Sequence, residues 1–181
     1  CEYAEENYDC DGNCIVDVDC NGDCGGDAVV DECGECDGDG SSCGTAQYFT
    51  DLPEPTGESS LIIIQDIAGL DEGDEVGLFD ANGVVVTDTT GTDPQYGEVL
   101  VASGVWEGNQ LELVAVISID LSDFNGPILN GAVEGNDIVI KVWDQSQDYV
   151  HDANPNYTMG DGTYGQVLTV IDVLDAYVYG C

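Results

Sequence analysis

Acidic and amide side chains stand at every second position in the stretch DCDGNC, and this spacing suits the binding of Ca²⁺. Asp9, Asp11 and Asn13 supply the oxygens, and Gly12 follows the central acid. Calcium loops place oxygen ligands at alternate positions and need a glycine where the chain turns sharply. Because Ca²⁺ takes about six to eight hard oxygen ligands, neighbouring turns would have to complete the shell.

Two more sets repeat this spacing, one beginning at Asp17 in DVDCNGD and one in ECDGDG. The set at Asp17 lacks the glutamate that closes an EF-hand loop, because Ala28 occupies that position, and no helical pattern flanks it. We therefore expect several Ca²⁺ ions in loops of another kind, held by a disulfide framework. The predicted ligands in the three sets are Asp9, Asp11, Asn13, Asp17, Asp19, Asn21, Asp23, Glu35, Asp37 and Asp39.

A fourth set of oxygen ligands stands much later in the chain, in the stretch DLSDFNG. Asp120, Asp123 and Asn125 offer carboxylate and amide oxygens within one turn. We expect a further calcium loop there, although acid-rich turns are also a plain consequence of the composition.

Nine cysteines are present, and seven of them fall between Cys10 and Cys43. Such density is typical of an oxidising, extracellular compartment, where disulfides form and persist. We expect the cysteines to pair behind the rows of acids. The residues expected to form disulfides are Cys1, Cys10, Cys14, Cys20, Cys24, Cys33, Cys36, Cys43 and Cys181.

Two other interpretations of this segment stay open. Zinc ribbons use paired cysteines, and Cys33 with Cys36 forms a C-x-x-C pair, but zinc would leave the interleaved acids unexplained. The plainest alternative is a solvated acidic loop with disulfides and no specific metal.

The odd number of cysteines leaves at least one without a partner inside the chain. A disulfide from Cys1 to Cys181 of a neighbouring copy leaves seven cysteines, which is still an odd number. Lipidation of Cys1 instead leaves eight cysteines, enough for four disulfides. Because both ends are cysteine and the first residue is not Met, we expect a polymer link or an excerpt of a longer protein.

The charge of the chain excludes several kinds of partner. It has 38 acidic residues, one lysine and no arginine, and its formal net charge is -37. Nucleic acids and anionic membrane surfaces need basic patches, so we expect neither as a partner and no membrane insertion. A hydrophobic fraction of 43% still indicates a folded protein. Salt or bound cations must then offset the repulsion among its negative charges.

The composition changes near Cys43, which predicts two domains. Residues 1–44 lack long apolar runs and need disulfides or metals to hold them, whereas residues 45–181 alternate β-branched stretches with turn signals. We predict an all-β fold: a β-sandwich, Ig-like or jelly-roll-like, of about seven to nine strands, preceded by a disulfide-rich, calcium-binding irregular segment. The ANG at 81–83 predicts a hairpin turn, and residues 122–136 predict a long loop.

Four single residues have simple structural interpretations. No nucleophile is arranged near His151 in the sequence, so we expect it in a loop rather than in a catalytic site. Lys141 is expected to pair with a carboxylate, and an internal isopeptide bond is the second option. Trp106 and Trp143 are expected to be core anchors rather than sugar platforms.

Several stretches resemble modules of secreted proteins. DCNGDCGGDAVVDECGECDGDGSSC is similar to cysteine- and glycine-rich repeats of large bacterial surface proteins, and its second half resembles the cysteine-rich region of secreted metazoan metalloproteases. The alternating acids resemble the thrombospondin type 3 calcium repeat. Residues 70–143, which contain GDEVGLFD and all but the last residue of IVIKVWD, resemble a β-sandwich domain common in secreted proteins of the Bacteroidetes. The resemblance implies a modular, exported surface protein.

These features predict a structural protein rather than an enzyme. We expect an extracellular, cell-surface subunit of a calcium-stabilised filament, in which copies associate head to tail through calcium, disulfides and strand addition from residues 46–52 or 167–179. The alternative is a carbohydrate-binding or adhesion module that contacts glycans or a cell surface. A secreted hydrolase would need a catalytic constellation that is not visible. Short triplets suggest glycosylation at Asn156 and Thr89.

Overall fold

A computed structural model describes residues 7–9, 11–29, 36–37, 45–86 and 94–177. The chain divides into two compact units, Cys1–Cys43 and Gly44–Cys181. Within the described residues, the second unit holds nine strands and one short 3₁₀ helix. The elements in chain order are β1 (Ser59–Ile64), β2 (Ile67–Ala68), β3 (Glu75–Val86), β4 (Gln95–Val105), β5 (Leu111–Val116), η1 (Ser122–Phe124), β6 (Val139–Asp144), β7 (Tyr149–Asp152), β8 (Asn154–Met159) and β9 (Leu168–Asp175).

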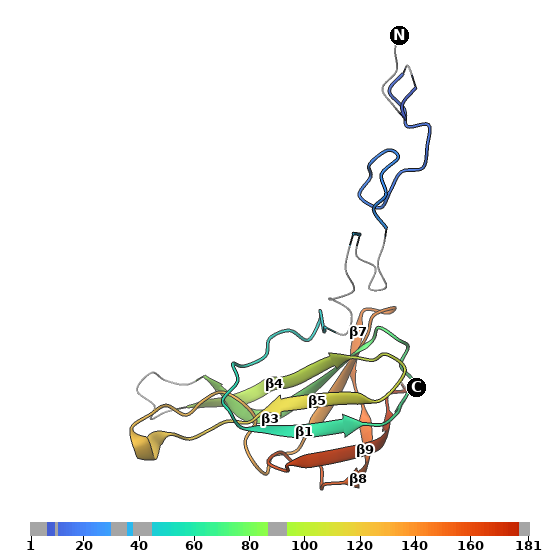
Figure 1. Ribbon diagram of the computed structural model, residues 1–181. Coiled ribbons are helices and arrows are strands. Elements are labelled where there is room, and N and C mark those ends of the chain that lie inside the picture. Colours follow the sequence, from blue (N-terminus) through green and yellow to red (C-terminus); the bar gives the residue numbers. More distant parts are fainter. Residues whose placement is uncertain (1–6, 10, 30–35, 38–44, 87–93, 178–181) are drawn as a thin grey trace. The chain divides into compact units, whose positions relative to one another are not determined.

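These strands form two sheets that share one core. One sheet has the order β2-β9-β1-β5, with β8 paired to β9, and the other has the order β4-β3-β6-β7. β1 is antiparallel to β5 but parallel to β9, so an early strand and the last strand lie side by side (Figure 1). The prediction of an all-β sandwich is confirmed.

The core lies between the sheets and takes alternate residues from strands such as β1 and β6, as period-two side chains require. Ile62 and Ile64 of β1 are fully buried, and so are Val76 and Leu78 of β3. Burying a side chain of this size contributes about 1.5–3 kcal/mol. Trp106 joins this core, as predicted.

The sequence Ala81-Asn82-Gly83 is not a hairpin turn, and that prediction is wrong. β3 runs through these residues and pairs with β4 on both sides of them, with a register shift between Asp80 and Gly83. The Asp80 carboxylate accepts a hydrogen bond of 2.8 Å from the N–H of Asn82. This local bond shapes a bulge in a continuing strand, where a turn-like sequence would otherwise reverse the chain.

Two strands, β7 and β8, have no counterpart in the sequence prediction. Both contain polar residues and lack the apolar alternation that marks a strand. His151 therefore lies in β7 and not in a loop, contrary to the prediction. Its Nε2 lies 2.6 Å from the carbonyl oxygen of Ala176, just after β9.

Trp143 is not a core anchor, contrary to the prediction, because its side chain lies on the face of β6 that points away from the core. Ile140 and Val142 occupy the buried positions, which leaves Trp143 half-buried on the outer face. Its ring stacks on Tyr48 with centroids 4.9 Å apart and planes 9° apart, and its Nε1 donates to Asp148.

Tyr164 is fully buried, yet its hydroxyl has no hydrogen-bond partner within the part of the chain that the structure describes. Burial, and then the negative charge of Asp80, raise the pKa of this phenol far above its ordinary value, so it stays protonated. An unsatisfied buried polar group costs about 1–3 kcal/mol. We expect Tyr164→Phe to raise the free energy of unfolding by about 1 kcal/mol in urea titrations followed by tryptophan fluorescence. A clear loss of stability would mean that the hydroxyl bonds an ordered water.

Candidate functional sites

Asp9 organises the first of the predicted calcium loops. Its Oδ1 accepts hydrogen bonds from the N–H groups of Asp11 (2.9 Å) and Asn13 (2.8 Å). The N–H of Gly12 donates to the carbonyl oxygen of Asp9, and its φ of 84° is one that glycine adopts readily. The Asn13 side chain and these backbone donors lower the pKa of Asp9, so an ionised carboxylate holds the turn.

The second loop repeats the first at a shift of ten residues. Asp19 Oδ1 accepts hydrogen bonds from the N–H groups of Asn21 (3.0 Å) and Asp23 (2.8 Å). The N–H of Gly22 again donates to the carbonyl oxygen of the leading acid, at a φ of 91°. The repeat in sequence is therefore a repeat in backbone structure.

Two disulfides join described residues of this unit. Cys14 bonds Cys24, which is the equivalent position of the second loop, and Cys20 bonds Cys36. The disulfide prediction is confirmed for these four residues, and their sulfurs are not available as thiolate ligands for zinc. The other predicted disulfide residues, Cys1, Cys10, Cys33, Cys43 and Cys181, lie outside the described residues.

Within the described ranges, no three Asp, Glu, His or Cys side chains converge closely enough to hold a metal ion. Asp9 and Asp19 keep lone pairs beyond those that the backbone N–H groups use, so both loops can still offer oxygens. The remaining oxygen ligands of a Ca²⁺ ion would have to come from residues outside the described ranges or from side chains that move toward the ion. Of the third set only Asp37 is described, because Glu35 and Asp39 lie outside. Calcium binding at Asp9, Asp11, Asn13, Asp17, Asp19, Asn21, Asp23, Glu35, Asp37 and Asp39 stays a prediction.

The fourth predicted set surrounds η1. Asp120 Oδ1 accepts a hydrogen bond of 2.8 Å from the N–H of Ser122, and the hydrogen bonds from Ser122 lower the pKa of Asp120. Asn125 ends the turn in the left-handed conformation, at a φ of 56°. Asp120, Asp123 and Asn125 are all exposed, and calcium binding by them stays a prediction.

Glu75 is a buried carboxylate that lies outside the acid-rich loops predicted from the sequence. It is 2% exposed and accepts hydrogen bonds from three successive backbone N–H groups, those of residues 47–49. This contact draws Phe49 over Gly77, where an added Cβ would lie 3.1 Å from its ring. Glu75 therefore fixes residues 47–49 against the outer face of β3.

Asp80 fixes the long loop at residues 122–136 in the same way. It is 1% exposed, and its Oδ2 accepts a hydrogen bond of 2.8 Å from the N–H of Val133. The amide of Asn136 donates to both carboxylate oxygens at 3.0 Å. The sequence carries a signal for Glu75 and Asp80, because both stand among apolar residues and glycines of a single strand. A carboxylate buried in such a strand needs hydrogen-bond donors from other segments.

Lys141 pairs with Glu98, as predicted, at 2.8 Å from both carboxylate oxygens. Its Nζ also lies 4.6 Å from the centre of the Phe79 ring. The single basic side chain of the protein thus neutralises one acid of β4.

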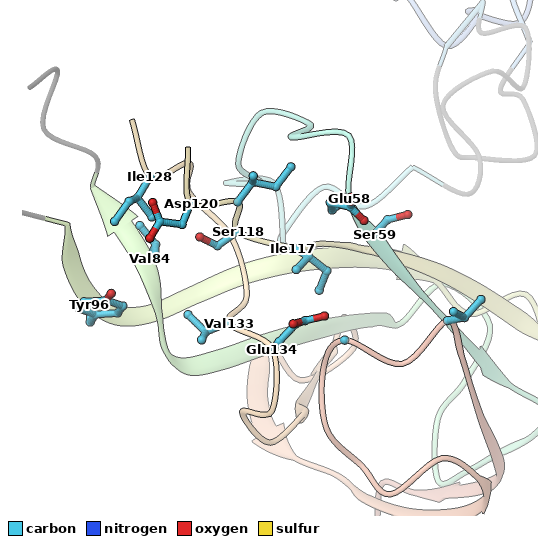
Figure 2. A pocket seen from close by; sticks show the side chains of 13 residues that line it. Glu58, Ser59, Val84, Tyr96, Ile117, Ser118, Asp120, Ile128, Val133 and Glu134 are labelled. Atoms are coloured by element: carbon cyan, nitrogen blue, oxygen red, sulfur yellow. The ribbon is translucent and has the colours of Figure 1, made fainter. Parts of the chain in front are cut away.

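Two of the hollows among the described residues of the second unit are large enough to hold a small ligand. The first, of about 610 Å³, lies at one end of the sandwich, where β1 begins, β5 ends and the outer parts of β3 and β4 meet. Figure 2 shows Asp120 beside Ile128 and Val84 on one side, Glu58 on the opposite side and Glu134 below Ile117. The second hollow, of about 600 Å³, is lined by residues 48–54 together with residues of β3 and β4.

The predicted glycosylation sites fall in different parts of the chain. Asn156 lies exposed in β8, and Thr89 lies outside the described residues. The described residues contain no helix long and apolar enough to cross a membrane.

Comparison with models of known protein families and with curated proteins gives no match. Among solved structures, the crystal structure of a 9R-lipoxygenase from Cyanothece is similar at 13% identity and a TM-score of 0.33. The likeness covers 76% of this chain and 20% of the lipoxygenase chain, so this protein spans a small part of that enzyme's length. A likeness of this strength carries no conclusion about activity.

Proposed function

We propose that this chain is a structural subunit of an extracellular filament or surface fibre, with Ca²⁺ bound to its N-terminal repeats. The observation that carries the proposal is the repeated acid loop. Two turns with the same hydrogen bonds follow each other and are cross-linked at equivalent cysteines. The described residues of these repeats include no buried apolar side chain, which suits a spacer that cations and disulfides stiffen.

The difference between the loops supports a cation. In the first loop, Nδ2 of Asn13 donates to the Asp9 carboxylate at 3.0 Å and offsets part of its charge. In the second loop, Asp23 takes the equivalent position beside Asp19, so two carboxylates replace a carboxylate and an amide. Like charges at such a position repel, and a bound Ca²⁺ would relieve the repulsion while accepting both as ligands.

Strand β4 supports self-association. It ends its sheet and pairs only with β3 among the described strands. Its eleven residues include one acid, Glu98, which is the partner of Lys141. In a chain of charge -37, this neutralised edge is where a second copy could add a strand with the least repulsion.

The two segments predicted as strand donors are already used within the chain. Residues 168–175 form β9, which pairs with β8 on one edge and with β1 and β2 on the other. Residues 47–49 are held by Glu75. Self-association in this proposal therefore uses pairing at the edge formed by β4 and not donation of these segments.

Calcium titration tests the proposal. We expect saturable Ca²⁺ binding by calorimetry, and filaments in electron micrographs that shorten or fray when a chelator is added. Asp23→Asn makes the second loop resemble the first and should weaken binding about tenfold, as expected for loss of one charged ligand.

Asp172→Asn is the matched control, because it removes the same charge from the exposed face of β9 in the other unit. The control should bind Ca²⁺ as the wild type does. Filaments and loop structure that are indifferent to chelator would overturn the calcium proposal.

A carbohydrate-binding or adhesion module is the second candidate. The observation that favours it is the aromatic stack of Tyr48 on Trp143, since Tyr48 is 48% exposed and borders the second hollow. This function predicts a monomer, indifferent to chelator, that binds a glycan and loses binding in Tyr48→Ala.

A further inference from the structure

The hollow at the end of the sandwich combines apolar surface with an acidic rim (Figure 2). Val84 and Ile117 are nearly fully buried and belong to its inner part. Val167 and Tyr96, which also line it, are 88% and 54% exposed. Large apolar side chains left open to solvent beside a hollow are a feature of ligand-binding surfaces.

Three carboxylates border this apolar surface, and none of the described residues that line the hollow is Lys, Arg or His. Figure 2 places Asp120 and Glu58 on opposite sides and Glu134 below, with Ile117, Ser118 and Val133 between them. These acids do not converge on one point, so the arrangement suits separate positive charges better than a single ion.

A second copy of this chain cannot supply those charges. Its single lysine, Lys141, is already paired with Glu98, and it has no arginine. Anionic ligands are repelled by the rim and by the charge of the whole protein, which in turn concentrates cations at its surface. An inorganic cation would leave the apolar surface unused.

We propose that this hollow binds a linear aliphatic amine, a diamine or polyamine, whose ammonium groups meet the rim carboxylates while its methylene chain covers the apolar surface. Each CH₂ removed from water adds to binding, and each ammonium group gains a carboxylate partner. The volume of about 610 Å³ lies in the range of small-ligand sites. This inference is independent of the calcium proposal, since it uses other residues.

The test is calorimetric titration of the full chain with 1,5-diaminopentane, at physiological salt and with excess Mg²⁺ to saturate non-specific sites. We expect one saturable site. The triple variant Glu58→Gln, Asp120→Asn and Glu134→Gln should bind about tenfold more weakly, as three partly exposed ion pairs allow. Val167→Ser should weaken binding severalfold, because it removes apolar surface without touching charge.

The matched control is the triple variant Glu107→Gln, Glu112→Gln and Asp172→Asn, which removes the same charge from exposed positions outside the hollow. It should bind the diamine within about twofold of the wild type. Equal losses in both triple variants, or displacement of the diamine by Mg²⁺, would overturn the proposal. Tighter binding of a Gly-Lys-Gly peptide than of the diamine, lost in the first triple variant, would also overturn it and assign the hollow to a basic segment of another protein.

Discussion

Glu75→Gln is expected to lower the free energy of unfolding of the sandwich by about 3 kcal/mol, because hydrogen bonds to a charged group contribute about 1.5–3 kcal/mol each. Gln keeps the size of Glu but replaces one acceptor oxygen with an NH₂ group. That group would face backbone N–H donors of residues 47–49 at a position where the side chain is 2% exposed. Urea unfolding followed by tryptophan fluorescence measures the change, since Trp106 and Trp143 both lie in the second unit.

Glu72→Gln is the control for this variant, because it makes the same chemical change three residues away at an exposed position. It should shift the free energy of unfolding by less than about 0.5 kcal/mol. Glu75→Gln should also alter the near-ultraviolet circular dichroism of the Tyr48–Trp143 stack, because Tyr48 N–H donates to Glu75. A variant as stable as the wild type would show that Glu75 does not hold this segment.

Asp80→Ala is expected to be the most destabilising single change, with a loss of about 4 kcal/mol. It removes the acceptor of the half-buried Val133 N–H and the carboxylate contacts of the Asn136 amide, which keeps only its 3.2 Å bond to the carbonyl oxygen of Asn82. It also removes a side chain that is 1% exposed. The same change should make residues 122–136 more susceptible to proteolysis at low denaturant, because the bonds that fix that loop are gone.

Asp80→Asn separates the hydrogen bonds from the space that the side chain fills. The Asn oxygen still accepts from one donor, so we expect a loss of about 2 kcal/mol, between the wild type and Asp80→Ala. Asp172→Ala, on the exposed face of β9, should leave stability nearly unchanged. Equal effects of Asp80→Ala and Asp172→Ala would mean that charge reduction, rather than loop anchoring, decides the outcome.

Both variants address one property of this chain. With a single lysine, it cannot satisfy its buried carboxylates with ion pairs. Glu75 and Asp80 instead take backbone N–H donors from segments far away in the sequence. Asp74 accepts one hydrogen bond from the distant N–H of Gln145 and another from the N–H of Asp71, three residues away. Neutral donors satisfy a buried carboxylate without a cation, and each such contact fixes a loop.

The sequence by itself determined the features that depend on neighbours a few residues apart. The acid spacing around Asp9 and Asp19 predicted sharp turns, and both turns form because the carboxylate reaches the N–H groups two and four residues on. Stretches of β-branched residues between turn signals predicted the all-β class, since a preference for extended backbone is a local property of those residues. Cysteine density likewise predicted disulfides.

Only the tertiary structure decided which distant segments meet. Glu75 finds residues 47–49, Asp80 finds Val133, and β1 lies parallel to β9, all across separations that no local pattern encodes. The same holds for Trp143, whose outward position follows from which face of β6 the core selects. Local spacing sets the backbone geometry of a turn. Packing decides which of the many carboxylates is buried and which loop supplies its N–H donors, because only a buried carboxylate is costly to leave without them.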